Sequence, residues 1–268
     1  MTECPYPYYI KVPDNKAYPF AYYRVPCGKC LFCRQRMANN WFVRIKQDIS
    51  HSPAFFVTLT YADEFLPYSE TGLPAVSRSD FTNFMKRFRK LVGLQGIKYF
   101  ACSEYGPTTF RPHYHMLLWN IPGINKEALS LALWETWTKG FIQVDPVNDE
   151  RIRYVVKYQL ELPSEFTNDY EPVFRVMSKG IGKGYVDKNQ VYHRGRLDRY
   201  FYRDGEFHYP LPRYWSEKLY TKLERASITA EHKFEEFRTH EDYVTAVQRI
   251  ATAEKNLKRK FSKKRKNG

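Results

Sequence analysis

Two histidines, His113 and His115, stand two residues apart at the start of an apolar run. Side chains alternate faces along a β-strand, so both imidazoles would point to one side of it and Tyr114 to the other. Two imidazoles on one face are a suitable pair of ligands for a divalent metal. An isolated His-x-His pair is nevertheless a weak signal, because most histidines are ordinary surface or core residues. The pair predicts a metal site only if other residues complete it.

A second pair of residues could supply a nucleophile. Tyr154 and Tyr158 are four positions apart and would share one face of a helix, with Lys157 beside them. A tyrosine can attack a phosphodiester and form a covalent phosphotyrosine. Its phenol has a pKa near ~10, so the reaction needs a metal that polarises the phosphate and neutralises developing charge. Lys157 could add a positive charge there or orient the phosphate. The alternative is that both tyrosines are aromatic core on an amphipathic helix.

Glu104 is the best candidate for a third metal ligand. It precedes the Gly106-Pro107 turn, and the strand that it ends is expected to pair with the strand of the histidines. A carboxylate beside two imidazoles suits Mg²⁺ or Mn²⁺. The alternative is a surface carboxylate at the end of a strand.

The cysteines suggest a separate metal site. Cys27, Cys30 and Cys33 form a Cys-x-x-Cys-x-x-Cys run, and Cys4 could reach back as a fourth ligand. Four thiolates would make a structural Zn²⁺ site that fastens the N-terminal arm to the first helix. An iron–sulfur cluster is the less favoured variant, and small buried residues at a turn are the alternative. Cys102 falls in a predicted strand and is expected in the core.

Composition points to a nucleic-acid partner and not to a membrane. The 268 residues include 43 Lys and Arg against 29 Asp and Glu, a formal charge of +14, and 17% of residues are aromatic. Cations interleaved with aromatic rings suit single-stranded nucleic acid, although many of the tyrosines are expected to be half-buried core. No apolar run approaches the ~20 residues of a transmembrane helix, and the N-terminus lacks a signal segment. Few, unevenly placed cysteines argue against a disulfide scaffold, so a reducing cytoplasm is the default.

Hydrophobic periodicity predicts a regular central region of class α+β. A helix follows Cys33, with an apolar stripe of Met37, Trp41, Ile45 and Ile49. The next six elements alternate as β-α-β-β-α-β, the arrangement of a ferredoxin-like antiparallel sheet. Ser79 or Asp80 would cap the first of their helices, Gly140 would close the second, and Asn148 or Asp149 would cap a further helix. The predicted strands are 54–61, 97–105, 113–120 and 141–147, and the predicted helices are 81–92, 125–139 and 148–160.

The two ends of the chain are less regular. Residues 1–26 are expected to form an extended arm, and residues 210–215 a rigid, extended exit from an irregular region. From about Ser216 the chain reads as a polar helical extension that ends in a basic tail able to hold DNA phosphates. The predicted divisions are a Cys-rich arm with helix (1–50), a nuclease core (51–162), an accessory region (163–215) and the extension (216–268).

Several of these motifs together resemble one family. His113-Tyr114-His115 resembles the His-hydrophobic-His motif of HUH endonucleases, residues 56–61 (Phe-Val-Thr-Leu-Thr-Tyr) their first motif, and residues 154–158 their two-tyrosine motif. Residues 25–30, 104–106, 111–115 and 212–214 are similar to the replication initiation proteins of gokushovirus-type microviruses. The resemblance runs from about Cys4 to Trp215.

The resemblance implies the HUH endonuclease fold and rolling-circle replication in the cytoplasm of a bacterial host. A tyrosine would nick origin DNA, stay on the 5′ phosphate and leave a 3′ hydroxyl as primer; the second tyrosine would later cut the regenerated origin. The residues around Gly180 lack phosphate-loop spacing, so a host helicase would unwind the duplex and a host polymerase would extend the primer. Related phages often have a lysine three positions after the second tyrosine. Here that position is Glu161, which makes Tyr158 the less certain nucleophile.

Two other functions remain open from the sequence. One is a non-catalytic module that binds single-stranded nucleic acid on a sheet of aromatic residues. The other is a hydrolytic nuclease in which the metal activates water and no covalent intermediate forms.

Overall fold

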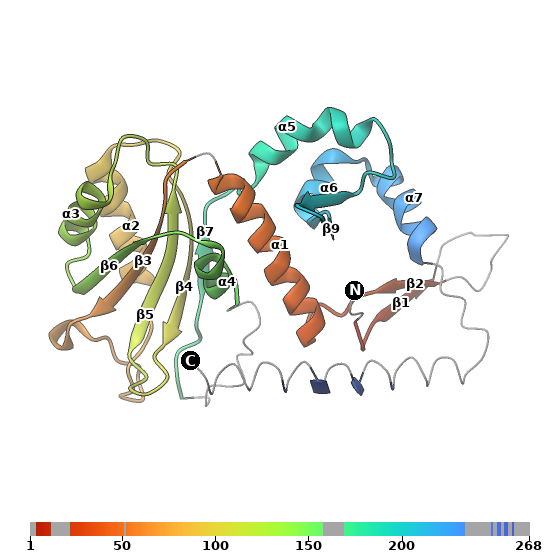
Figure 1. Cartoon of the computed structure of the whole chain (residues 1–268). Helices are drawn as coiled ribbons and strands as arrows, with labels where there is room; N and C mark the ends of the chain where they lie inside the picture. Colours follow the sequence, from red (N-terminus) through yellow and green to blue (C-terminus); the bar gives the residue numbers. More distant parts are fainter. Residues whose placement is uncertain are drawn as a thin grey trace. The chain divides into compact units, whose positions relative to one another are not determined.

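The computed structural model describes residues 4–11, 22–50, 52–157 and 169–233, together with 248, 251, 252, 255, 256 and 259. The chain divides into two compact units, one of residues 41–187 and one of residues 1–40 with 188–268. Figure 1 labels the elements of each unit. Helix α1 (Leu31–Ile49) contributes residues to both units.

A five-stranded antiparallel sheet forms the centre of the unit of residues 41–187. Its order in space is β6-β3-β5-β4-β7, and every neighbouring pair is antiparallel. The predicted α+β class and the predicted succession β-α-β-β-α-β from β3 to β6 are confirmed. The fifth strand, β7, was not predicted from the sequence. The bounds are β3 Ala54–Tyr61, β4 Lys98–Tyr105, β5 Pro112–Trp119, β6 Gly140–Pro146 and β7 Arg175–Met177.

Helices α2 (Arg78–Val92) and α3 (Lys126–Thr136) cover one face of this sheet (Figure 1). The strands alternate, so every second side chain faces these helices and forms the core with their apolar sides. Burying each large side chain contributes roughly 1.5–3 kcal/mol of transfer free energy. The buried residues include Val57, Leu59, Phe81, Phe84, Phe88, Tyr114, Met116, Leu129, Leu133 and Trp137.

Two buried tyrosine hydroxyls fix the start of α2 on the sheet. Tyr61 and Tyr114 form a 2.8 Å hydrogen bond between their hydroxyls, and Tyr61 also donates to a carboxylate oxygen of Asp80 at 3.0 Å. The Tyr114 hydroxyl accepts the backbone N–H of Ser77 at 2.8 Å. Tyr114 therefore points away from the histidines on either side of it in sequence, as strand alternation predicted.

The other face of the sheet carries helix α4 (Asp149–Lys157), which contacts β4 and β5 (Figure 1). Asn148 begins this helix, because its side-chain oxygen accepts the backbone N–H of Arg151 at 2.9 Å. Ile152, Val155 and Val156 are buried and hold the helix on the sheet. The predicted cap at 148 is confirmed, and the remainder of the predicted helix, 158–160, lies outside the described residues.

Three details of the predicted helices were wrong. Helix α2 begins at Arg78 and is capped by Ser77, whose side chain accepts the N–H of Asp80, so the cap precedes the predicted Ser79 or Asp80. Gly140 does not close α3; it starts β6 with φ of 154°. Trp134, predicted on the apolar side of α3, is 65% exposed.

The stripe predicted for α1 is also partly wrong. Ile45 is fully buried, but Met37 is exposed. The buried residues of this helix instead include Phe32, Ala38, Phe42 and Val43. A four-residue repeat drifts around a helix of 3.6 residues per turn, so over 19 residues it does not mark one face.

The unit of residues 1–40 and 188–268 holds two small antiparallel pairs and several helices. The predicted N-terminal arm contains strands β1 (Tyr8–Lys11) and β2 (Tyr22–Val25), paired antiparallel. The predicted extended exit near Pro212 is wrong after that residue, since α6 starts at Arg213. The other elements are the end of α5 (Lys183–Arg194), β8 (Phe201–Asp204), β9 (Phe207–Pro210), α6 (Arg213–Leu219) and α7 (Lys222–Lys233).

Most of the predicted basic tail lies outside the described residues. Among the helices that the structure does describe, none combines the length and the apolar character that a membrane crossing requires.

Candidate active site

Strand β5 presents His113 and His115 on the sheet face that carries α4. Their rings are nearly parallel, with 4° between the planes and 6.4 Å between the centroids. The two neighbouring strands fix what lies beside them: Thr58 of β3 is opposite His115, and Glu104 of β4 is opposite His113. The register of the sheet therefore brings the predicted carboxylate to the predicted histidines.

Glu104 reaches diagonally across the strands to the second histidine. Its Oε2 lies 3.0 Å from Nε2 of His115, and the two side chains are only 18% and 11% exposed. Diagonal neighbours on antiparallel strands are within reach of long side chains. Such a nitrogen–oxygen pair, shielded from water, is either an ion pair or two donors for one cation.

Tyr154 of α4 closes the site above the sheet. Its hydroxyl donates a 2.9 Å hydrogen bond to Oε2 of Glu104 and lies 3.5 Å from Nε2 of His115. The tyrosine ring stands edge-on to His115, with 5.1 Å between centroids and 88° between planes. A nucleophile candidate, an acceptor for its proton and a histidine nitrogen thus meet at one point.

Lys157 lies beside this tyrosine, one turn further along α4. Its Nζ is 4.0 Å from the centroid of the Tyr154 ring. At that distance the ammonium group interacts favourably with the ring face. The second predicted nucleophile, Tyr158, and Glu161 lie outside the described residues.

The ring nitrogens of both histidines have defined partners. Nδ1 of His113 donates to the carbonyl oxygen of Arg111 at 2.7 Å, which leaves Nε2 as the lone-pair nitrogen of the neutral ring. Burial lowers the pKa of His113, with a smaller contribution from His115, and so favours that neutral form. Nδ1 of His115 pairs with Oγ1 of Thr58 at 3.1 Å. Partners on the far nitrogen orient histidines that bind metals.

Sequence reasoning did not single out two residues that help to build the site. Phe56 stacks on His115, with 5.5 Å between centroids and 12° between planes, and meets Tyr154 edge-on at 6.2 Å. Arg111 donates to the carbonyl oxygen of Tyr61 at 2.8 Å and pairs with Asp63 at 2.6 Å. Alternation along β3 could have placed Phe56 and Thr58 on one face, but only the register shows that this is the face of the histidines.

The four predicted metal-binding cysteines form a second cluster, in the unit of residues 1–40 and 188–268. The sulfur atoms of Cys4, Cys27, Cys30 and Cys33 all lie within 4.8 Å of one another. Burial raises the pKa of the Cys27 thiol, but hydrogen bonds from the N–H groups of Cys30 and Lys29 outweigh it and bring the pKa to about 7. Burial raises the pKa of Cys30 and Cys33.

Two further sequence features have structural roles. Cys102 is buried on β4, as predicted for a core residue. The carbonyl oxygen of Ile181, in the glycine-rich turn, accepts two hydrogen bonds from Arg44 at 2.8 and 3.1 Å.

Comparison with known proteins assigns the sheet region to a class. Residues 54–161 match a family model for replication-associated proteins of the ORF2 type. This segment contains both histidines, Glu104 and Tyr154, and it belongs to that family.

The relatives are replication proteins of small phages. The replication-associated protein ORF2 of Spiroplasma virus 4 is 35% identical over 187 residues, which cover 62% of this chain and 58% of that protein. The replication-associated protein VP4 of Bdellovibrio phage phiMH2K is 29% identical over 221 residues, 74% and 68% of the two chains. The replication-associated protein ORF4 of Chlamydia phage 1 is 28% identical over 153 residues, 50% and 37%.

These matches confirm the relationship to phage replication proteins that the motifs predicted. The aligned segment spans little more than half the length of the Spiroplasma virus protein. No solved structure matches the chain.

Proposed function

We propose that this protein initiates rolling-circle replication by nicking and rejoining single-stranded origin DNA through a covalent 5′-phosphotyrosine, on a fold of the HUH endonuclease type. The observation that carries the proposal is the position of the Tyr154 hydroxyl, 2.9 Å from Glu104 and 3.5 Å from His115. The family match of residues 54–161 supports the role in replication.

In this proposal Tyr154 is the nucleophile of the first cut. Its hydroxyl oxygen forms a bond to the phosphorus, and the bond from phosphorus to the 3′ oxygen breaks, which leaves a 3′ hydroxyl once that oxygen takes up a proton. A phenol is protonated at neutral pH, so its proton must be accepted as the bond forms. Glu104 Oε2 already accepts the hydroxyl hydrogen bond and is the group positioned to accept that proton. The phosphotyrosine conserves the energy of the bond, so rejoining needs no nucleotide cofactor.

The residues present fit a hard divalent cation. Two ligands at right angles around Mg²⁺, each about 2.1 Å from the metal, lie about 3 Å apart. Nε2 of His115 and Oε2 of Glu104 are separated by 3.0 Å. Nε2 of His113 is left without its proton by the Nδ1 bond to Arg111, so it is a third donor. A bound Mg²⁺ or Mn²⁺ would polarise the scissile phosphate and neutralise charge that develops on it.

Lys157 has a positioning role in this proposal. Its ammonium group stands over the ring of Tyr154, next to the place where the phosphate must lie for attack. A positive charge there attracts the phosphate oxygens and orients them toward the hydroxyl. Tyr158 is proposed as the nucleophile of the second cut, and a host helicase and a host polymerase as partners that supply the single strand and extend the primer.

The test is a cleavage assay on an oligonucleotide that carries the phage origin, with Mn²⁺, resolved on a denaturing gel. The expected result for the wild-type chain is a labelled protein–DNA adduct together with a free 3′ fragment. Tyr154→Phe with Tyr158→Phe should abolish the adduct, because both attacking oxygens are removed while both rings remain. Tyr68→Phe, at a tyrosine that is 61% exposed, is the matched control and should leave the adduct intact.

The same gel separates the competing functions. An adduct that persists in the double variant would overturn the assignment of the tyrosines. Cleavage without an attached protein would indicate a hydrolytic nuclease that activates water. Salt-sensitive binding without any cleavage would indicate a module that only binds single-stranded DNA.

A further inference from the structure

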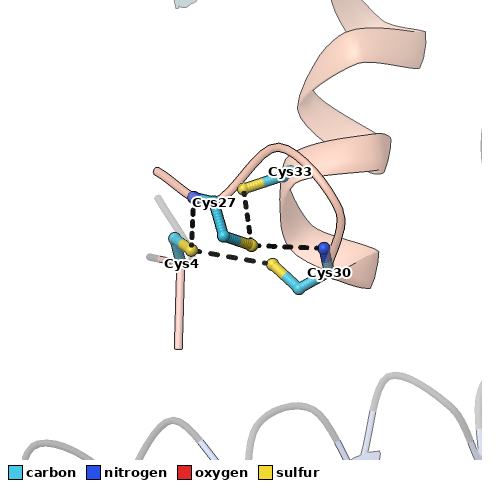
Figure 2. A group of neighbouring side chains, drawn as sticks. All are labelled: Cys4, Cys27, Cys30 and Cys33. Carbon is cyan, nitrogen blue, oxygen red and sulfur yellow. Dashed lines mark hydrogen bonds between the residues drawn. The ribbon is translucent and has the colours of Figure 1, made fainter. Parts of the chain in front are cut away.

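Four cysteines that are far apart in the sequence bring their sulfur atoms together at the start of α1 (Figure 2). The Sγ atoms of Cys4 and Cys30 are 3.8 Å apart, and those of Cys27 and Cys33 are 4.0 Å apart. All four are thiols and not halves of a disulfide. The separations agree with this, since the sulfur atoms of a disulfide lie about 2.05 Å apart.

The spacing corresponds to four ligands of one ion. Four sulfurs at about 2.3 Å from a central Zn²⁺ form a tetrahedron with edges of about 3.8 Å. The observed pairs, at 3.8 and 4.0 Å, have that length, and no two of the four sulfurs are more than 4.8 Å apart. A multi-iron cluster places iron and sulfide between the cysteines and would spread the sulfur atoms further.

We propose that Cys4, Cys27, Cys30 and Cys33 bind one structural Zn²⁺ ion through four thiolates. The site is separate from the proposed active site in its residues and its chemistry, so the inference does not depend on the proposed function.

The backbone around the cluster is shaped to hold thiolates. The N–H of Cys27 donates to the sulfur of Cys4 at 3.2 Å, and the N–H groups of Lys29 and Cys30 each donate to the sulfur of Cys27 at 3.4 Å. Gly28 makes the turn that aims these groups inward, with φ of 74°, a conformation that favours glycine. Backbone donors of this kind stabilise negative sulfur.

The surroundings also balance the charge of the site. Four thiolates around Zn²⁺ carry a net charge of −2. Cys33 lies in the first turn of α1, where the helix dipole favours negative charge and where the sequence has no acidic residue. Arg34 donates from Nε to the carbonyl oxygen of Lys29 at 2.8 Å, so a cation is anchored on the same loop.

The ion would hold the N-terminus of the chain in place. Cys4 precedes the pair of short strands β1 and β2, and the other three ligands follow it. An isolated pair of strands is marginally stable in water. A metal bound on both sides of it closes the loop and removes freedom from the unfolded chain, as a crosslink does.

Metal analysis of the full chain tests the proposal. The protein is expressed in medium that contains zinc and iron and purified without chelators, and both metals are measured by mass spectrometry. We expect one zinc per chain and no iron in the wild type. Cys4→Ser and Cys33→Ser should each lose the zinc. Two controls should keep it: Cys102→Ala, at a buried cysteine outside the cluster, and His113→Ala with His115→Ala in the proposed active site.

A second measurement stays decisive if the serine variants fail to fold. Wild-type protein stripped of metal under reducing conditions is titrated with Co²⁺, and the absorption of thiolate-bound tetrahedral cobalt is recorded. Saturation at one equivalent, followed by loss of the absorption when Zn²⁺ is added, is the expected result. Iron in place of zinc, zinc retained in both serine variants, or cobalt without thiolate absorption would overturn the proposal.

The two proposals can fail separately. Loss of zinc binding in Cys33→Ser is read from the metal content, whereas loss of nicking in Tyr154→Phe is read from the adduct. A chain that binds zinc but forms no adduct would contradict only the proposed function.

Discussion

The hydroxyl of Tyr154 lies 2.9 Å from Oε2 of Glu104, although the two residues belong to a helix and a strand that are 50 positions apart in the sequence. The same carboxylate oxygen is 3.0 Å from Nε2 of His115. One oxygen therefore serves two functions that are needed at different moments: it accepts the tyrosine hydroxyl and it is a donor for a cation. This makes Glu104 the residue through which the nucleophile and the histidines are coupled.

Glu104→Gln should lower the rate of adduct formation by roughly 10²-fold or more, because a neutral amide neither accepts a proton nor holds a divalent cation well. The measurement is single-turnover nicking in Mn²⁺. Glu135→Gln, at an exposed position on α3, is the matched control and should nick at the wild-type rate. A Glu104→Gln rate within about threefold of wild type would remove this carboxylate from the mechanism.

Much of the site could be predicted from the sequence because its motifs are local. The alternation that placed His113 and His115 on one face depends only on strand geometry, and residues 54–61 formed the strand that their β-branched and aromatic residues predicted. The cysteine run likewise marked a cluster through spacing alone.

What could not be predicted depends on contacts between distant segments. Phe56 stacks on His115 because β3 pairs with β5 in one particular register, and no local pattern sets that register. Strand β7 has only three residues, and it adds to the edge of the sheet through pairing with β4. Gly140 looked like the end of a helix because glycine is common there, yet its conformation is required by the neighbouring strand.

Gly140→Ala should destabilise the sheet unit by roughly 2 kcal/mol or more. A Cβ atom at this position would lie 2.3 Å from the carbonyl oxygen of Thr60 and 2.4 Å from the amide nitrogen of Ala62, both of which are backbone atoms that cannot turn aside. The residue also has φ of 154°, which L-residues rarely adopt. Urea unfolding followed by fluorescence measures the change.

Gly184→Ala is the matched control for that variant. Gly184 lies in α5, and a Cβ there meets no atom within 4 Å. Alanine in a helix is favoured over glycine by up to ~1 kcal/mol, so this variant should be unchanged or more stable. Equal destabilisation by the two substitutions would show that the close approach at Gly140 is not what constrains it.

Asp48→Ala should destabilise the protein by roughly 2–4 kcal/mol. The Asp48 side chain is 6% exposed; Oδ2 accepts from Nζ of Lys98 at 2.7 Å and from Nε1 of Trp119 at 3.2 Å. Its removal leaves a partly buried ammonium group and an indole N–H without this acceptor. Asp187→Ala breaks an exposed ion pair with Lys183 and should cost no more than about 0.5 kcal/mol. Similar losses in the two variants, measured by urea unfolding, would contradict the argument.

The buried histidine of α5 should make stability depend on pH. His193 is fully buried, its Nδ1 donates to the carbonyl oxygen of Arg199, and burial lowers its pKa below the ordinary value. The unfolded chain therefore binds a proton near pH ~6.5 that the folded chain does not yet bind. The stabilisation is complete above about pH 6.5 and is lost as the pH falls toward the folded-state pKa, at no more than about 1.4 kcal/mol per pH unit.

The variant His193→Gln isolates this contribution, because His113 also has a lowered pKa and adds a slope of the same sign in both proteins. Glutamine keeps a side-chain N–H but does not titrate, so the variant can lose a constant amount of stability at every pH. The informative quantity is the difference between the two unfolding free energies measured from about pH 7 down to about pH 5. That difference should shrink as the pH falls, since only the wild type is penalised by acid. A difference that stays constant over this range would mean that His193 takes up its proton in the folded state as readily as in the unfolded chain.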